Sequence, residues 1–286
     1  DYVPAGSAFT GIVGVFNRES KDTSPNGSTI NIDGKNKNLG VFGEATYRFA
    51  NGFDVTGGLR YEETSLDRFV EIPGLGISGD RALNVQDLEF DDILPSLTLG
   101  YEPNTNLRYA FKVSRGFNPG GVGTSFARAT NPGSTEDPFV PFNEETVTNY
   151  ELSVRGRFLE DRVFIAGNLF YGDFKGYQFA TVSVLPNGDI DSVISNADSA
   201  KNYGLELDAQ FEATDRLWLT GSLGLLQTEA GEVRNAVTPI AGNDLPFAPP
   251  VTATFGVEYQ VTDRFSVGGQ INYSAGYFSD IQNTPD

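Results

Sequence analysis

Three residue types are absent from this chain of 286 residues, and each absence excludes some chemistry. Without cysteine there is no disulfide, no thiolate nucleophile and no cysteine metal site. Without histidine the chain lacks the commonest general base and the commonest metal ligand. We therefore expect no catalytic residues, no bound metal and no cofactor.

Methionine is also absent, even at position 1, which predicts an internal or processed segment of a longer chain. No apolar run approaches the roughly 18 residues of a membrane helix, but barrel strands leave no such run. Acidic residues outnumber basic ones, and the formal net charge is −18. Because phosphate binding needs clustered lysine and arginine, we expect no nucleic-acid partner.

Alternating hydrophobicity dominates what is present, most clearly between Tyr203 and Leu226. Apolar and polar side chains alternate from Tyr203 to Glu212, and again from Leu217, after a polar turn at residues 213–216. A period of two is that of a β-strand. The pattern predicts a long antiparallel hairpin with one apolar and one polar face.

The same alternation recurs along the chain and predicts about eleven strands. Short turns near residues 51, 104, 161, 215 and 263 alternate with longer breaks at about 20–37, 65–87, 116–143, 177–200 and 229–247. The arms are longer than soluble strands usually are and match the nine to eleven residues or so of a tilted membrane strand. Short turns at one edge and long loops at the other are typical of outer-membrane barrels.

Aromatic residues on the apolar face gather at two heights. One row lies beside the short turns and comprises Phe49, Phe53, Tyr101, Phe158, Phe211, Tyr259 and Phe265. The other lies near the opposite strand ends and comprises Tyr61, Tyr150, Tyr171, Tyr203 and Tyr277. Tilted strands would separate the rows by about 20–30 Å, which matches the apolar band of a membrane barrel between two aromatic girdles. A soluble β-sandwich with a closed core does not predict such rows.

We therefore predict an all-β, antiparallel up-and-down transmembrane β-barrel whose outer face contacts outer-membrane lipids and lipopolysaccharide. The polar face would line a hydrated lumen, because each charge facing lipid costs a few kcal/mol. The expected lumen-facing residues are Arg108, Lys112, Glu151, Arg155, Arg157, Glu206, Asp208, Glu212 and Glu258. A solvated wall of mixed charge accounts for them without a dedicated substrate path.

Several segments resemble TonB-dependent outer-membrane receptors. They are Ser114–Gly121 (SRGFNPGG), Phe142–Leu152 (FNEETVTNYEL), Phe158–Arg162, Asn196–Leu207 and Leu245–Pro250. The resemblance covers roughly residues 88–286 and implies a barrel of about 22 strands. Residues 1–286 would be a partial barrel domain. The N-terminal plug, the segment that touches TonB and the closing C-terminal strands would lie outside it.

The resemblance implies a receptor that binds a scarce nutrient, such as a ferric siderophore or another bulky solute, and imports it with energy from TonB. The candidate ligand-binding residues are Arg115, Phe117, Asn118 and Arg128, in and beside the 116–143 break. Charge and aromatic stacking there suit a chelate. Loop packing and lipopolysaccharide contact are the alternative account of these residues. Asn118 departs from the basic residue that many members of the family carry.

Two other functions remain open at this point. A passive porin or autotransporter-type barrel would share the strand pattern and lack a plug. A secreted β-rich enzyme would use paired acids such as Glu206 and Asp208. Those two lie about 7 Å apart on one strand face, and such pairs recur on any polar wall.

Overall fold

The computed structural model describes residues 8–24, 31–72, 81–125, 127–128, 137–184, 188, 190–233 and 239–285. The strands are β1 (Phe9–Thr23), β2 (Asn31–Arg48), β3 (Phe53–Ile72), β4 (Arg81–Asn104), β5 (Leu107–Asn118), β6 (Gly121–Thr124), β7 (Phe139–Phe142), β8 (Glu145–Phe158), β9 (Val163–Val184), β10 (Ile190–Thr214), β11 (Leu217–Ala230), β12 (Val251–Thr262) and β13 (Phe265–Ser274).

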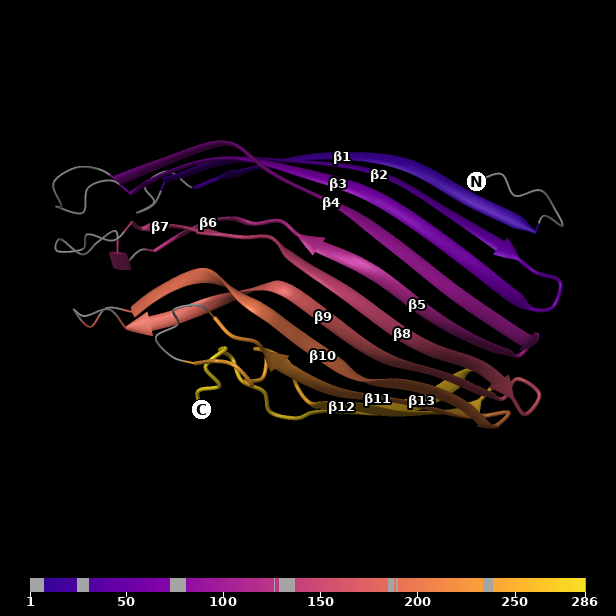
Figure 1. Cartoon of the computed structure of the whole chain (residues 1–286). Coiled ribbons are helices and arrows are strands. Elements are labelled where there is room, and N and C mark those ends of the chain that lie inside the picture. Colours follow the sequence, from indigo (N-terminus) through magenta and orange to yellow (C-terminus); the bar gives the residue numbers. More distant parts are fainter. Residues whose placement is uncertain are drawn as a thin grey trace.

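Eleven of these strands form one antiparallel sheet in the order β1-β2-β3-β4-β5-β8-β9-β10-β11-β12-β13. Each strand pairs with its neighbour in sequence, except that the small β6–β7 hairpin is inserted between β5 and β8. Figure 1 shows the sheet as a single curved layer. The all-β, up-and-down antiparallel prediction is confirmed, and β1 and β13 are the edges of an unclosed sheet.

The hairpin that the sequence predicts most clearly is present in the expected register. Leu205 of β10 lies opposite Leu225 of β11, and Leu207 lies opposite Leu223. A register shift between Glu212 and Thr214 adds a residue just before the turn. The apolar side chains of both strands therefore share one face of the sheet.

Three predicted breaks are shorter than expected. The structure extends β3 to Ile72 and begins β4 at Arg81, so most of 65–87 is strand rather than loop. Similarly, β9 and β10 occupy most of 177–200, and β1 and β2 narrow the break at 20–37. These extensions carry polar residues on both faces. Backbone pairing continues there although the sequence shows no regular alternation.

The apolar face is uncovered among the residues that the structure describes. Leu207, Val257 and Ile271 are 38%, 39% and 73% exposed. In the described ranges the only other sheet is the two-stranded β6–β7 hairpin, which contacts β10. A dry sandwich core is therefore excluded for this face. Of the described helical residues, none belongs to a helix long and apolar enough to span a membrane.

Aromatic rings lie side by side at matched heights. Tyr150, Tyr171 and Tyr203 are directly opposite one another on β8, β9 and β10, with ring centroids 6.2 and 6.4 Å apart. At the short-turn end, Phe53 stacks on Tyr101 at 4.3 Å. All seven aromatic residues of the predicted short-turn row except Tyr101 are exposed. Their contact with the membrane interface stays a prediction.

Candidate functional site

One face of the sheet, which we call the polar face, carries side chains that reach across intervening strands. Arg108 in β5 donates hydrogen bonds of 2.7 and 3.0 Å to the carboxylate of Asp54 in β3, across β4. The guanidinium of Arg60 in β3 lies 4.7 Å from the ring centroid of Phe16 in β1, across β2. Side chains converge on the concave side of a curved sheet. These contacts suit the inner face, and that orientation of the polar face stays a prediction.

The predicted lumen-facing residues lie on this face by strand register. Arg108 also contacts Glu102 at 2.6 Å. Lys112 is opposite Glu151, which accepts a 2.7 Å hydrogen bond from Asn149. The remaining members are Arg155, Arg157, Glu206, Asp208, Glu212 and Glu258. Whether they line a hydrated lumen stays a prediction.

We call the end of the sheet opposite the short turns the long-connection end. There, the β6–β7 hairpin is clasped to the start of β10. The carboxylate of Asp191 is buried, and it accepts hydrogen bonds from the Ser125 hydroxyl and, at 2.7 Å, from Nε of Arg128. The backbone N–H of Arg128 in turn donates to Ser125 Oγ at 3.1 Å. The clasp holds the segment after β6 against the β9–β10 wall.

The base of the same segment is anchored by Gln178 of β9. Its side-chain amide donates to the carbonyls of Pro119 and Asn143, both at 2.9 Å. Its side-chain oxygen accepts from Asn118 Nδ2 at 2.9 Å. Its backbone N–H donates to Glu145 at 2.6 Å. The Gln178 side chain therefore joins Asn118, the last residue of β5, to Asn143, the residue that follows β7.

Asn196 of β10 completes this anchor. It accepts from the Asn143 N–H at 2.7 Å, and it donates to the carbonyls of Asn143 and Gly176 at 3.0 and 2.7 Å. Gly176 has a φ of +64°, and a Cβ there would lie 2.6 Å from the Glu144 carbonyl oxygen, so the site requires glycine. Three of the segments that resemble one receptor family thus meet in a single hydrogen-bond network, which we call the loop anchor.

Burial at the loop anchor raises the pKa values of two side chains, those of Glu145 and Tyr177. Burial raises the pKa of the Glu145 carboxyl, and the hydrogen bond from the Gln178 N–H opposes that change. Burial also raises the pKa of the Tyr177 phenol, and the negative charge of Glu145 adds to the effect.

A hollow of about 470 Å³ lies on the polar face between β1–β4 and the turn after β5. We call it the upper basin; its main lining residues are Phe16, Arg18, Asn38, Glu62, Phe90 and Gly120. A Cβ on Gly120 would lie 2.7 Å from the Phe90 ring and 2.6 Å from the Phe142 carbonyl oxygen. Glycine therefore lets the β5–β6 connection close one side of the basin against β4.

The charged residues around the upper basin differ in whether they have an ion-pair partner. Glu62 pairs with Arg60 Nη2 at 2.7 Å and accepts from Asn38 Nδ2, also at 2.7 Å. Asn38 donates to Thr64 Oγ1 at 3.0 Å as well. Arg18 is exposed, and among the residues that the structure describes no carboxylate pairs with it. Arg18 is thus the uncommitted charge of the basin.

A small hydrophobic cluster lies at the corresponding ends of β9, β10 and β11. Its buried members, which we call the mouth cluster, are Phe179, Ala197, Ala200, Ala230, Ile240, Leu245 and Ile281. The Leu245 N–H donates to Thr228 Oγ1 at 2.9 Å, and Asn243 Nδ2 donates to the Ile281 carbonyl at 2.9 Å. Segments after β11 and β13 are thereby held over β9–β11.

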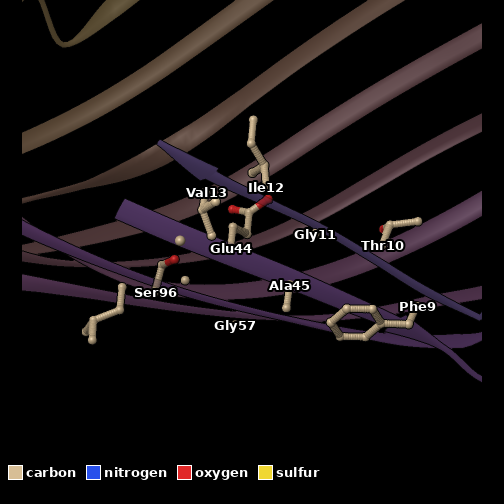
Figure 2. A pocket seen from close by; sticks show the side chains of 12 residues that line it. Phe9, Thr10, Gly11, Ile12, Val13, Glu44, Ala45, Gly57 and Ser96 are labelled. Atoms are coloured by element: carbon tan, nitrogen blue, oxygen red, sulfur yellow. The ribbon is translucent and has the colours of Figure 1, made fainter. Parts of the chain in front are cut away.

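A larger hollow of about 770 Å³ lies beside the edge strand β1 (Figure 2). Its lining includes Gly11, Gly43, Gly57 and Gly58. Ile12 and Glu44 are opposite each other in register, and Figure 2 shows their side chains rising together. The lining mixes both faces of the sheet and includes the exposed edge, so we assign it no ligand. A third hollow, of about 390 Å³, places Glu258 beside Trp218.

Three of the four predicted ligand-binding residues are engaged within the protein, and one of them, Asn118, belongs to the loop anchor. Arg115 donates to Asp92 at 2.9 and 2.7 Å, Asn118 donates to Gln178, and Arg128 contacts Asp191. Phe117 lies opposite Thr146 of β8. Their role toward a ligand stays a prediction.

The basin aromatics are not among the candidate residues that the sequence pattern predicts. Phe16 and Phe90 occupy polar-face positions, so each interrupts the alternation, and that interruption was the available signal. Within the described ranges no group of three acidic side chains is placed to hold a metal ion.

The chain as a whole matches a known protein family. The family model described as "TonB dependent receptor-like, beta-barrel" matches residues 5–286. Similar solved structures include the ferric yersiniabactin uptake receptor FyuA from Yersinia pestis, at 20% identity and a TM-score of 0.72 over 98% of this chain. The copper transporter OprC is 17% identical, with a TM-score of 0.68 over 93% of this chain. The siderophore receptor PiuA from Acinetobacter baumannii is 17% identical, with a TM-score of 0.65 over 88%. The matches cover 42%, 41% and 35% of those three chains.

Proposed function

Because this chain belongs to the TonB-dependent receptor β-barrel family of the outer membrane, we propose that it is part of a receptor that imports a scarce nutrient. The nutrient would bind at the long-connection end and cross the membrane with energy from TonB. The observation that carries the proposal is the construction of that end. The loop anchor, the clasp and the mouth cluster hold the connections at that end of the sheet.

The two faces of the sheet support the same function. Exposed apolar side chains cover one face, and we propose that lipids and lipopolysaccharide contact it. The opposite face carries paired and hydrogen-bonded charges, such as Arg108 with Asp54, which suit a hydrated passage. We propose a transport role and no catalytic one, as the family is one of transport receptors.

We further propose that residues 1–286 are one partial barrel domain of a larger protein. Strands β1 and β13 each pair on one side, and an exposed strand edge favours pairing with further strands. Additional strands would complete a barrel of about 22 strands. The plug and the segment that contacts TonB would belong to the rest of that protein.

The ligand class that we propose is a bulky solute such as a ferric siderophore. FyuA and PiuA, which share this fold, are receptors for ferric yersiniabactin and for a siderophore. At 20% identity or less these structures show the fold alone. The candidate ligand residues Arg115, Phe117, Asn118 and Arg128 belong to this proposal.

Uptake in cells tests the function. The full-length protein, expressed in a Gram-negative host that lacks its own siderophore receptors, should reach the outer membrane and migrate in a heat-modifiable way. It should then accumulate at least one of a panel of radiolabelled ferric siderophores, and accumulation should stop when tonB is deleted. Uptake that continues unchanged without TonB would identify a passive barrel instead.

A further inference from the structure

The upper basin combines two aromatic rings with a single uncommitted cation. Phe16 and Phe90 are aromatic residues on the polar face, and both line the hollow. Arg18 lies two residues from Phe16 on the same face of β1. Glu62, the acidic lining residue, is already paired with Arg60. The chain as a whole is strongly acidic, so a basin with a spare positive charge departs from its average.

Contacts around the basin fix the positions of its two aromatic rings. The Arg60 guanidinium rests against Phe16 and fixes the position of that ring. Gly120 approaches the Phe90 ring closely, and the Gln178 side chain donates a hydrogen bond to the carbonyl of the neighbouring Pro119. The mouth cluster lies over β9–β11, which are distant from β1–β4 in the strand order.

We propose that the upper basin is a ligand subsite for a flat ring that carries one negative charge. The ring would stack against Phe16 and Phe90, and its anionic group would accept hydrogen bonds from Arg18. Asn38 and Thr64 would contact polar substituents at the ring edge. A polyanion is disfavoured, because it would meet one free guanidinium together with the acidic groups Glu62 and Asp22 near the rim. This inference rests on the proposed receptor function, since it names the ligand chemistry of the same end of the barrel.

Small probes separate the ring from the charge. Benzoate has both, benzamide has a neutral ring of the same shape, and acetate has only the charge. Binding to the full-length protein in lipid nanodiscs would be measured by saturation-transfer NMR titration. Benzoate should bind with a Kd on the order of 1 mM, as expected for about nine heavy atoms. Benzamide and acetate should each bind at least about threefold more weakly, because an exposed charge pair contributes modestly.

Variants locate the binding. Arg18→Gln should bring benzoate to the affinity of benzamide, and Phe90→Ala should weaken both ring probes. The controls Arg155→Gln and Phe170→Ala change the same residue types on the polar face outside the basin and should leave all affinities unchanged. Heat-modifiable migration confirms folding. Should Phe90→Ala fail to fold, the exposed Arg18 still decides the test.

Equal binding of benzoate and benzamide, or unchanged benzoate binding in Arg18→Gln, would overturn the subsite. Absence of benzoate binding to the full-length protein would do so too, for it would mean that another part of the chain covers the basin. The binding measurement needs no TonB. Intact benzoate binding without TonB-dependent uptake would therefore overturn the proposed function alone, and uptake without a benzoate preference would overturn the subsite alone.

Discussion

Asp54 and Arg108 form their ion pair directly above Gly100, a residue of the strand that separates them. A side chain at Gly100 would occupy the positions of both charged groups. The Asp54 residue is only 5% exposed, so the pair is the main compensation for a nearly buried carboxylate. The smallest residue and the ion pair therefore form one structural unit near the short-turn end of the polar face.

Removing the cation from this unit should destabilise the barrel. We expect Arg108→Ala to lower the free energy of unfolding by about 1–2 kcal/mol, because it leaves Asp54 unpaired; the estimate is reduced for the exposure of Arg108. Urea unfolding of the full-length protein in lipid vesicles measures the change. Arg108→Ala combined with Asp54→Asn should cost less than the sum of the single changes, whereas Lys112→Ala should have little effect. Strict additivity would show that the pair does not contribute.

Gly100 should not tolerate even one added methyl group. Gly100→Ala should lower the free energy of unfolding by about 1–3 kcal/mol, because Asp54 and Arg108 must both move. The matched control is Gly57→Ala, where no atom lies within 4 Å of an added Cβ. Gly57→Ala should be neutral or slightly stabilising. The same unfolding assay compares the two, and equal effects would contradict the close approach at Gly100.

Loss of the Gln178 side chain should release the segment between β5 and β8. Gln178→Leu removes three hydrogen bonds, each contributing about 0.5–1.5 kcal/mol. Trypsin cleavage after Arg128 should accelerate about tenfold or more, because local opening of the segment becomes easier. The control is Gln210→Leu, the same substitution on the polar face of β10 outside the loop anchor. Unchanged cleavage at Arg128 would show that the clasp at Asp191 holds the segment without the loop anchor.

Glu145 should make stability depend on pH in a defined direction. Its pKa is raised in the folded protein, so folding favours the protonated carboxyl. The charged form therefore costs stability at neutral pH, and this cost is lost as the pH falls through the raised pKa toward the ordinary value of 4.5. Glu145→Gln should be more stable than the parent at pH 7 by less than about 1 kcal/mol, because the residue is half-buried. The difference between the melting temperatures of the two proteins should shrink between pH 7 and pH 4. A constant difference would contradict the assignment.

Periodicity predicted the strand faces because alternation is a local property. The hairpin from Tyr203 to Leu226 needed only its own residues to specify which side chains share a face, and β10 and β11 confirm it. The polar ends of β3, β4, β9 and β10 were missed for the complementary reason. Polar residues occupy both faces of those ends, so no regular alternation marks them in the sequence, although the backbone still pairs.

The basin and the loop anchor could not be derived in the same way. Phe16 and Phe90 come from β1 and β4, and Asn118, Asn143, Gln178 and Asn196 come from segments up to about 80 residues apart. The mouth cluster likewise joins β9 to a segment after β13. Each grouping depends on strand order and curvature, which no local pattern specifies.

The sequence by itself determined an antiparallel sheet with an apolar face, a polar face and two aromatic rows, because each property follows from period-two spacing along a strand. Only the tertiary structure decided that Arg128 turns to Asp191, that Gln178 holds the connection after β5, and that Arg18 has no partner among the described residues. The physical reason is that side-chain pairing depends on distances across strands, and the curvature of the whole sheet sets those distances.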